Sequence, residues 1–123
     1  MAAPNIVNVT SIIGNSLSVA VGTSATQLAS NAASSNKVFK INTIMIANID
    51  GTNAADVTVN IYSAAALGGT PLAIASTITV PADATLVVVD KGTSFYLLEN
   101  QSIGVIASAA GDLVATISFE EIL

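Results

Sequence analysis

The alternation of apolar and polar residues is clearest in the stretch that runs from residue 38 to residue 62. In its second half, Val57, Val59 and Ile61 alternate with polar or aromatic residues, which is typical of a strand that buries one face. The four residues 50–53 (Asp-Gly-Thr-Asn) have turn chemistry, and their glycine can take a positive φ. The stretch therefore predicts a long hairpin.

The first half of this stretch has apolar residues on both of its faces. One parity holds Phe39, Ile41, Met45, Ala47 and Ile49. The other parity holds Ile44 and Ile46. Because strands buried on both faces do not alternate cleanly, this half predicts a more central strand, covered on both faces or packed against a neighbour.

Shorter segments of the same kind precede the hairpin. A β-branched run over residues 6–13 ends at Gly14-Asn15, which is a turn signal. Residues 16–21 then alternate as a half-buried strand. Residues 25–29 predict a short strand; an Ala-rich helix over 25–33 is the alternative, although its Thr, Ser and Asn residues are poor in helix interiors.

The segments after the hairpin also read as strands and turns. Residues 63–69 end in two glycines and predict a flexible connection, and Pro71 begins a strand of mixed polarity. Residues 81–84 predict a turn with proline at its first central position. The run 86–89 is short enough for a strand buried on both faces. Further strands are expected over 95–98, 103–107 and 113–120, and in the last of them Leu113, Ala115, Ile117 and Phe119 face inward.

Eight or nine short strands spaced about 8–12 residues apart indicate an all-β fold, an antiparallel β-sandwich of jelly-roll-like type or a barrel, and we favour the sandwich. The predicted core is Phe39, Ile41, Val57, Val59, Ile61, Leu86, Val88, Ile103, Val105, Ile117 and Phe119. We expect one domain over residues 14–123, preceded by residues 1–13 as an N-terminal arm or a first strand.

The segment 1–13 carries apolar residues on both parities, so one sheet face cannot bury them all. Pro4 keeps its beginning out of a sheet interior. The segment is either an ordinary first strand or an extension that packs on a neighbouring subunit, and we favour the extension because termini reach outward unless they are tied down.

Composition changes this picture in one respect. Apolar residues make up 52 % of the 123 residues, but charged residues only 9 % and aromatic residues only 4 %. A typical soluble domain carries about 25 % charged residues. The surface is therefore either a coat of Ser, Thr, Asn and Ala or is buried against other subunits, and we favour burial because interface cores are depleted in charge.

Charge and cysteine content exclude several partners. The net charge is −5, with three lysines and neither arginine nor histidine, so no basic stripe exists for nucleic acid. With no cysteine, disulfides and thiolate metal sites are excluded. The N-terminus lacks the charged and apolar regions of a signal peptide, and no apolar run approaches the length of a membrane span, so we expect no membrane contact.

Catalytic constellations are missing from the sequence. Without His or Cys the usual nucleophile–base pairs are absent. A serine–lysine pair with Lys37, Lys40 or Lys91 remains formally possible, and nothing singles one out. Glu120 and Glu121 are strand neighbours that point to opposite faces, which does not suit the paired carboxylates of glycosidases. We therefore predict no catalytic residue, no cofactor and no enzymatic activity.

Two further signals have structural explanations. Asp50, Asn53 and Asp56 offer oxygens on one loop, but they miss the pattern of a calcium loop, and we expect the first two to stabilise a turn. The glycosylation triplets at 8–10 and 100–102 are expected by chance at this composition. We predict no metal site.

Several segments together resemble small virion structural proteins of tailed phages that infect marine bacteria, cyanophages in particular. They are MAAPNIVNVTSIIG, KVFKINTIMIANIDGTNAADVTVNIY, VPADATLVVVDK, FYLLENQSI and ISFEEI, and they span nearly the whole chain. The resemblance implies a β-sandwich building block present in many copies on a virion that is assembled in the host cytoplasm. It provides no motif from which functional residues could be transferred.

The expected function is that of a structural virion protein, with capsid decoration as the leading role: a cement protein that stabilises the head lattice through subunit contacts. The expected partners are copies of the chain itself, for which a trimer is one option, and the major capsid protein or other virion proteins. A tail or collar component is the alternative. A carbohydrate- or host-surface-binding module is the alternative of another class, with Tyr62 and Tyr96 as its candidate aromatic residues.

Overall fold

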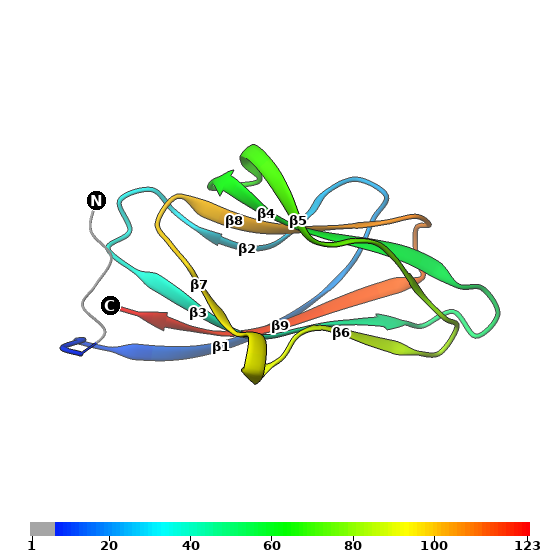
Figure 1. Cartoon of the computed structure of the whole chain (residues 1–123), viewed down its shortest axis with the longest axis horizontal. Coiled ribbons are helices and arrows are strands. Elements are labelled where there is room, and N and C mark those ends of the chain that lie inside the picture. Colours follow the sequence, from blue (N-terminus) through cyan, green and yellow to red (C-terminus); the bar gives the residue numbers. More distant parts are fainter. Residues whose placement is uncertain (1–6) are drawn as a thin grey trace.

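The computed structural model describes residues 7–123 as two antiparallel β-sheets packed face to face (Figure 1). Within these residues the strands are β1 (Ile12–Ala20), β2 (Thr26–Asn31), β3 (Val38–Asn48), β4 (Ala55–Ala64), β5 (Gly68–Val80), β6 (Thr85–Val89), β7 (Phe95–Leu97), β8 (Gln101–Ala107) and β9 (Leu113–Ile122). A single 3-10 turn, η1 (Lys91–Thr93), precedes β7. Residues 26–31 thus form a strand, and the alternative helix in this region was wrong.

Strand order confirms the predicted antiparallel sandwich. The first sheet has the order β1-β9-β3-β6, with β7 also paired to β3, and the second has the order β2-β8-β4-β5. The pairs are nested: β4 lies beside β5, β3 beside β6 and β7, β2 beside β8, and β1 beside β9. This nesting is the jelly-roll arrangement.

The predicted hairpin between β3 and β4 was wrong, because the two strands lie in different sheets. The segment 49–54 crosses from one layer to the other, and β4 pairs with β5 and β8. Both strands bury apolar residues in the same core from opposite sides. The sequence pattern therefore looks the same whether such strands pair or face each other.

Strand β3 changes its inward parity at a β-bulge. Phe39 and Ile41 face the core before it, and Ile44 and Ile46 face the core after it. In the pairing with β9 the register shifts between Ile41 and Thr43, which leaves Asn42 as the extra residue. The apolar residues predicted on the first parity beyond this point are exposed: Met45 by 36 % and Ile49 by 62 %. The two-sided apolar pattern thus reflects one bulge and not burial of both faces.

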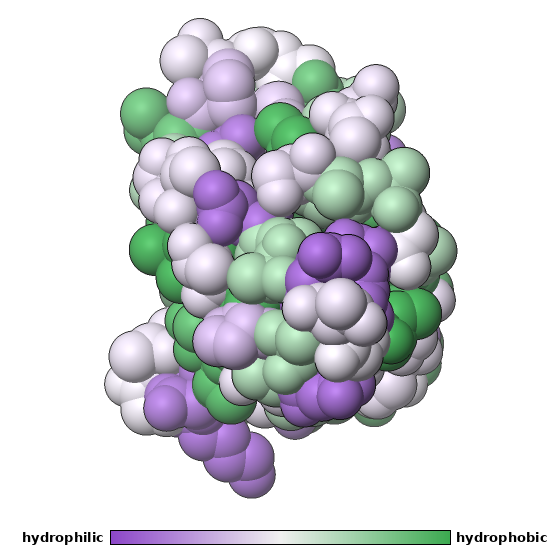
Figure 2. All heavy atoms as spheres, turned by 90° about the vertical axis from the view of Figure 1, so that its right-hand side faces the viewer, coloured by the Kyte–Doolittle hydropathy of each residue, from purple (hydrophilic) through white to green (hydrophobic). Residues whose placement is uncertain are grey.

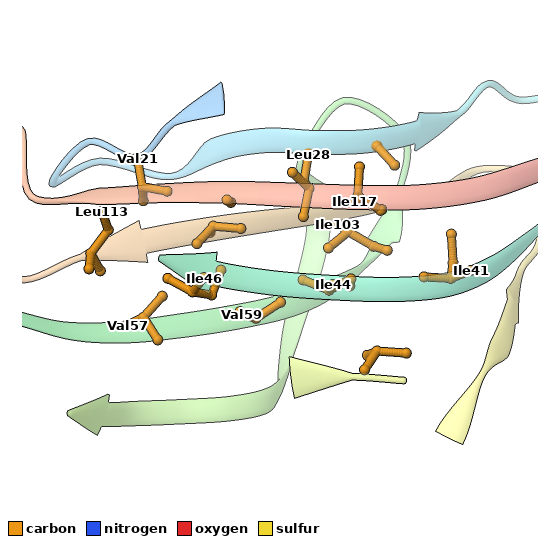
Figure 3. Close-up of a cluster of buried hydrophobic side chains, with 14 of the residues drawn as sticks. Val21, Leu28, Ile41, Ile44, Ile46, Val57, Val59, Ile103, Leu113 and Ile117 are labelled. Carbon is orange, nitrogen blue, oxygen red and sulfur yellow. The ribbon is translucent and has the colours of Figure 1, made fainter. Parts of the chain in front are cut away.

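All residues predicted for the core lie in the central cluster or pack against it. Figure 3 shows part of this cluster, including Ile41, Val57 and Ile117. Ile61, Leu86, Val88 and Phe119 are the partly buried ones. The rings of Phe39 and Phe119 stack with their centroids 5.1 Å apart. Fully buried side chains that the prediction did not place inward include Val21, Leu28, Ile44, Ile46, Val80 and Leu97.

Gly14 and Asn15 lie within β1 and form no turn. The register with β9 is continuous from Ile12 opposite Ile122 to Ala20 opposite Val114. The side-chain amide of Asn15 donates across to the Glu121 carboxylate at 2.8 Å, so its hydrogen bond supports the strand pair. The expected boundary between residues 13 and 14 therefore falls inside a strand, and residues 1–6 of the predicted arm lie outside the described residues.

The segment predicted as a flexible connection is a tight turn between β4 and β5, anchored by buried or half-buried hydroxyls. Leu67 N donates to Ser102 Oγ at 2.9 Å, and Ser102 Oγ donates to Ala64 O at 2.7 Å. Ala66 N donates to Ser30 Oγ at 2.9 Å. These bonds fold the turn over β8 and β2, and its two central residues take left-handed φ values of 56° and 60°.

Two smaller expectations also need correction. Ala84 N donates to Pro81 O at 3.1 Å, so Pro81 is the first corner of its turn and not the first central residue. Strand β6 is not buried on both faces, because Val87 is 53 % exposed. The reason is that its sheet meets the core with one face only, and no second layer covers the other face within residues 7–123.

Candidate functional site

The first 36 residues of the chain carry no charged side chain, and every lysine, aspartate and glutamate lies from Lys37 onward. Within the described residues this uncharged part comprises β1, β2 and their flanking loops, 7–36, which we call the β1–β2 side. β1 ends one sheet and β2 ends the other. The strands of this lateral side thus carry no charged residue of their own, although the ion pair of Lys37 and Glu121 lies beside them.

The backbone bonds at the two ends of β1 show which of its residues face β9. Ser11 and Leu123 exchange N–H···O bonds of 2.8 and 3.0 Å, and Val21 N donates to Leu113 O at 2.9 Å. These pairs continue the β1–β9 register, and bonded residues alternate along an antiparallel strand. The odd-numbered residues of β1 therefore bond to β9, and the N–H and C=O groups of its even-numbered residues point to the other edge. No strand within residues 7–123 pairs with that edge.

β1 also exposes apolar side chains. Ile12 is 59 % exposed, Ile13 49 % and Leu17 44 %. Ile13 and Leu17 lie opposite Glu121 and Ile117 of β9, on the face of the sheet that turns toward the second layer. They remain exposed because the second layer does not extend over this edge.

An open groove of about 380 Å³ lies between β1 and β2, where the two layers part. Its apolar wall includes Leu17, Leu28, Phe39 and Phe119, which come from four different strands. Its polar end holds Asn31, Lys37 and Glu121. The groove is therefore an extension of the core to the surface, closed at one end by polar groups.

The polar end of the groove is internally satisfied. Lys37 Nζ lies 2.9 Å from Glu121 Oε1, and this pair is partly exposed, so it contributes at most about 1 kcal/mol. The Asn31 amide donates to Lys37 O at 3.0 Å and to Leu97 O at 3.2 Å. Glu120 points to the opposite face, as predicted, where the Asn42 amide approaches it at 3.4 Å. These groups hold the groove in shape, and none of them is an unpaired reactive group.

The opposite lateral side also exposes apolar residues, but on an irregular strand. In β5, Leu72 is 72 % exposed, while Ile74 and Ile78 are each 40 % exposed. The pairing of β5 with β4 shifts register three times, Pro71 lies within the strand, and Thr77 has a φ of 50°. Such bulges and prolines make an edge a poor template for a further strand.

The structure does not bring the candidate aromatic residues together. Tyr62 is only 7 % exposed and packs over Gly104, where a Cβ would lie 2.8 Å from its ring. Tyr96 is 43 % exposed and belongs to β7 in the other sheet. The two rings that sequence reasoning offered for a sugar site therefore cannot share one.

Asp50 and Asn53 stabilise a turn, as expected, without a positive φ at Gly51. The pKa of Asp50 is lowered because Thr52 N–H and the Asn53 side chain and backbone donate to its carboxylate. Asp56 points elsewhere and accepts from Thr79 Oγ1 at 2.7 Å. Among residues 7–123, no group of three or more His, Cys, Asp or Glu side chains is arranged to hold a metal ion.

Figure 2 views the end of the sandwich that carries the loops 49–54, 81–84 and 108–112. Hydrophilic side chains there are interleaved with weakly polar and apolar ones and do not gather into one patch. No hydrogen bond joins a lysine Nζ to a serine hydroxyl in the part of the chain that the structure describes, where Lys37 Nζ donates to Glu121. No helix of that part is long and apolar enough to cross a membrane.

Comparisons with known proteins give information on the fold only. No family model matches the chain, and no curated protein matches it in sequence. Its structure is similar to a solved structure of Bacillus endospore appendages, described as a novel family of disulfide-linked pili, with a TM-score of 0.51 and 16 % identity. The similarity covers 90 % of this chain and 87 % of that one. Disulfide links are not available to this chain, which has no cysteine.

Sequence reasoning missed the groove and the free edge of β1. The groove residues lie far apart in the sequence and meet only through the sheet order. One signal was present: the absence of charge from the first 36 residues, which leaves that side without the charged groups that keep a surface soluble.

Proposed function

We propose that this protein is a non-enzymatic structural subunit of a phage virion, a decoration or cement protein that reinforces the head lattice through subunit contacts. The observation that carries the proposal is the β1–β2 side, whose own residues carry no charge, with a strand edge that no strand within residues 7–123 pairs and an open, largely apolar groove. The resemblance of the sequence to small virion proteins supports the same function.

The proposed mechanism is physical. Fully burying one exposed Ile or Leu side chain contributes about 1.5–3 kcal/mol, from which the entropy lost on association must be subtracted. A cement protein present in many copies needs only a modest net gain at each contact, because the gains accumulate over the lattice. Its partners are copies of itself and the major capsid protein, and it acts without nucleic acid or membrane.

The test locates the protein on the particle. Antibodies against the recombinant chain, detected by gold labelling on purified virions that carry its gene, are expected to label the head surface. Heads stripped of the protein are expected to rupture at lower temperature and to regain stability when it is added back. Absence of the chain from purified particles overturns the proposal. Gold label confined to the tail or collar shows instead that the protein is a tail or collar component.

A second candidate is a subunit of a thin appendage, favoured by the similarity to the pilus structure over 90 % of this chain. Under that function the purified chain alone assembles into filaments visible by electron microscopy, without capsid shells. A carbohydrate- or host-surface-binding module ranks lower, because Tyr62 is buried and Tyr96 stands alone. Binding of the isolated chain to a glycan panel would favour it.

A further inference from the structure

We propose that the β1–β2 side is a two-fold self-association interface, in which β1 of one copy pairs antiparallel with β1 of a second copy. The inference rests on the proposed function only in treating the chain as a subunit that contacts copies of itself. The partner is thereby specified by its chemistry: it is an uncharged extended strand, supplied by the same sequence.

The free edge of β1 selects an extended backbone as its partner. The N–H and C=O groups of residues 12, 14, 16, 18 and 20 point away from β9, and no strand within residues 7–123 pairs with them. A row of unpaired strand groups is a template for another strand. The groove beside it offers an apolar surface to the side chains that such a strand brings.

β1 is the sheet edge best suited to this pairing. Its register with β9 runs over nine residues without a shift, and it contains no proline, charge or positive φ. The other edges are less regular: β5 contains Pro71 and three register shifts, β2 has six residues and one shift, and β6 has five residues. Edge strands are normally protected by such devices, and β1 has none of them.

The charge distribution favours a second copy over another partner. β1 and β2 carry no charged residue, and the Glu121 carboxylate beside β1 is paired with Lys37 at 2.9 Å, so two copies can meet through the β1–β2 side without bringing unpaired acidic groups together there. A positively charged partner would instead bind the surface formed by residues 37–123, which carry the net charge of −5. An antiparallel pair of identical strands is self-complementary, so the assembly closes as a dimer.

Pairing restricts the register, and full overlap of the strand then selects one. The even-numbered residues carry the free bonding groups, so they must face even-numbered residues of the second copy. Full overlap of Ile12–Ala20 with itself places Ser16 on the two-fold axis and Gly14 opposite Ser18 of the second copy. On the inner face, Ile13 then lies opposite Val19 of the second copy. The two grooves adjoin across the axis, and the exposed Leu17 side chains cover them.

Two variants test this arrangement. Ser16→Pro removes an N–H that points to the free edge and leaves the bonds to β9 intact, which an edge strand tolerates. We expect this variant to keep the circular dichroism spectrum and melting temperature of the monomer and to lower the association constant at least about tenfold, as the loss of one to two net hydrogen bonds requires. The readout is sedimentation equilibrium of the full chain at concentrations around the micromolar range.

Cysteine cross-linking tests the register independently, because the natural chain has no cysteine. In the Ser16→Cys variant the two introduced thiols, one from each copy, meet at the two-fold axis. We therefore expect this variant to form a covalent dimer under mild oxidation. Ser18→Cys is the matched control, since it lies on the same strand face and meets Gly14 of the second copy instead. Equal cross-linking of both variants, or of neither, overturns the register.

Other outcomes decide against the interface. Growth of the mass beyond a dimer with rising concentration indicates head-to-tail pairing and overturns the two-fold arrangement. A purely monomeric protein, or a Ser16→Pro variant that still associates fully, overturns the β1 interface. The interface and the proposed function can fail separately. If the chain dimerises but is absent from virions, only the proposed function is overturned. If it is monomeric but present on heads, only the interface is overturned.

Discussion

At the scale of single residues, Gly104 shows how the backbone of one strand accommodates the side chains of another. A Cβ at this position would lie 2.8 Å from Tyr62 Cε1 and 2.9 Å from Leu67 Cδ2. Tyr62 and Leu67 thereby both pack against the backbone of β8 at Gly104, and Leu67 N is held to β8 through Ser102 Oγ. The aromatic ring is part of the packing and is not available to a ligand.

We expect Gly104→Ala to destabilise the monomer by about 1–3 kcal/mol, because overpacking outweighs the gain of roughly 0.4–1 kcal/mol from a less flexible unfolded chain. Gly14→Ala is the matched control, since a Cβ there meets nothing within 4 Å and the residue also lies in a strand. Urea denaturation at low protein concentration measures both. Equal stability of the two variants would contradict the packing described for Tyr62.

Asp50 makes a pH-dependent contribution to the stability of the folded chain. Its pKa is lowered from the ordinary 3.8 because Thr52 N–H and Asn53 donate hydrogen bonds to the charged carboxylate. A group whose folded pKa is depressed contributes stability that is fully present above its unfolded pKa and is lost as pH falls through the folded pKa. The contribution of Asp50 is therefore present at neutral pH and disappears below 3.8.

The corresponding prediction concerns Asp50→Asn. This variant should have a lower Tm than the natural chain at about pH 6, and the difference should shrink as pH falls below the unfolded pKa of 3.8. Calorimetry across this range measures it. A difference that stays constant down to about pH 2 would show that the ionised carboxylate does not contribute.

At the scale of elements, the bulge in β3 decides which side chains enter the core. Asn42 is an extra residue relative to β9, and it allows Ile41 and Ile44 to face inward although they are three positions apart. Without the bulge, an unbroken strand would turn Ile44 and Ile46 to the solvent. A single backbone irregularity thus replaces the two-sided burial that the sequence pattern suggested.

Deleting Asn42 is therefore expected to be tolerated. The shortened strand alternates regularly and keeps Ile41, Ile44 and Ile46 inward, so the loss should stay below about 2 kcal/mol. Deleting Met45 is the matched control, because it turns Ile46 outward and should cost about 4 kcal/mol or more. Thermal unfolding followed by circular dichroism distinguishes the two. Similar destabilisation by both deletions would mean that the bulge does not set the register.

At the scale of the whole molecule, the uneven distribution of charge is the dominant surface feature. All charged residues lie from Lys37 onward, and the acidic group that lines the groove of the β1–β2 side, Glu121, is paired with Lys37. Self-association through that side gains nothing from ion pairs and is opposed by the like net charges of the two copies. Salt screens this repulsion over the Debye length of about 10 Å at 0.1 M.

Raising the salt concentration from about 0.05 M to about 0.5 M is therefore expected to strengthen self-association modestly, because screening reduces repulsion while apolar contacts and strand pairing persist. Sedimentation equilibrium at both salt concentrations measures the effect. Dissociation at high salt would show that ion pairs hold the copies together, and it would move the contact to residues 37–123, which carry all the charge.

Much of the fold was predictable because local patterns specify it. In β9 the alternation identified Leu113, Ala115 and Ile117 as buried, since this strand has one inner face and no bulge between them. The class of fold followed from the number and spacing of such segments. Alternation depends only on which face of a strand meets the core, so it can be read without knowing the neighbours.

The candidate site was not predictable in the same way. Leu17, Leu28 and Phe119 line one groove only because β1, β2 and β9 lie at the same side of the sandwich. The crossing from β3 to β4 was predicted to be a hairpin, because the residues of the segment 49–54 suit a hairpin turn and a crossing between two sheets equally well. Pairing is a property of two segments, and neither segment contains the information alone.

The sequence by itself determined the all-β class, the inward face of most strands and the absence of charge from the first 36 residues, because each depends on residue type and local spacing. Only the tertiary structure decided the strand order, the bulge at Asn42 and the position of β1 as an unprotected edge beside an open groove. These features depend on backbone hydrogen bonds between segments distant in sequence, and those bonds are nearly independent of side-chain identity.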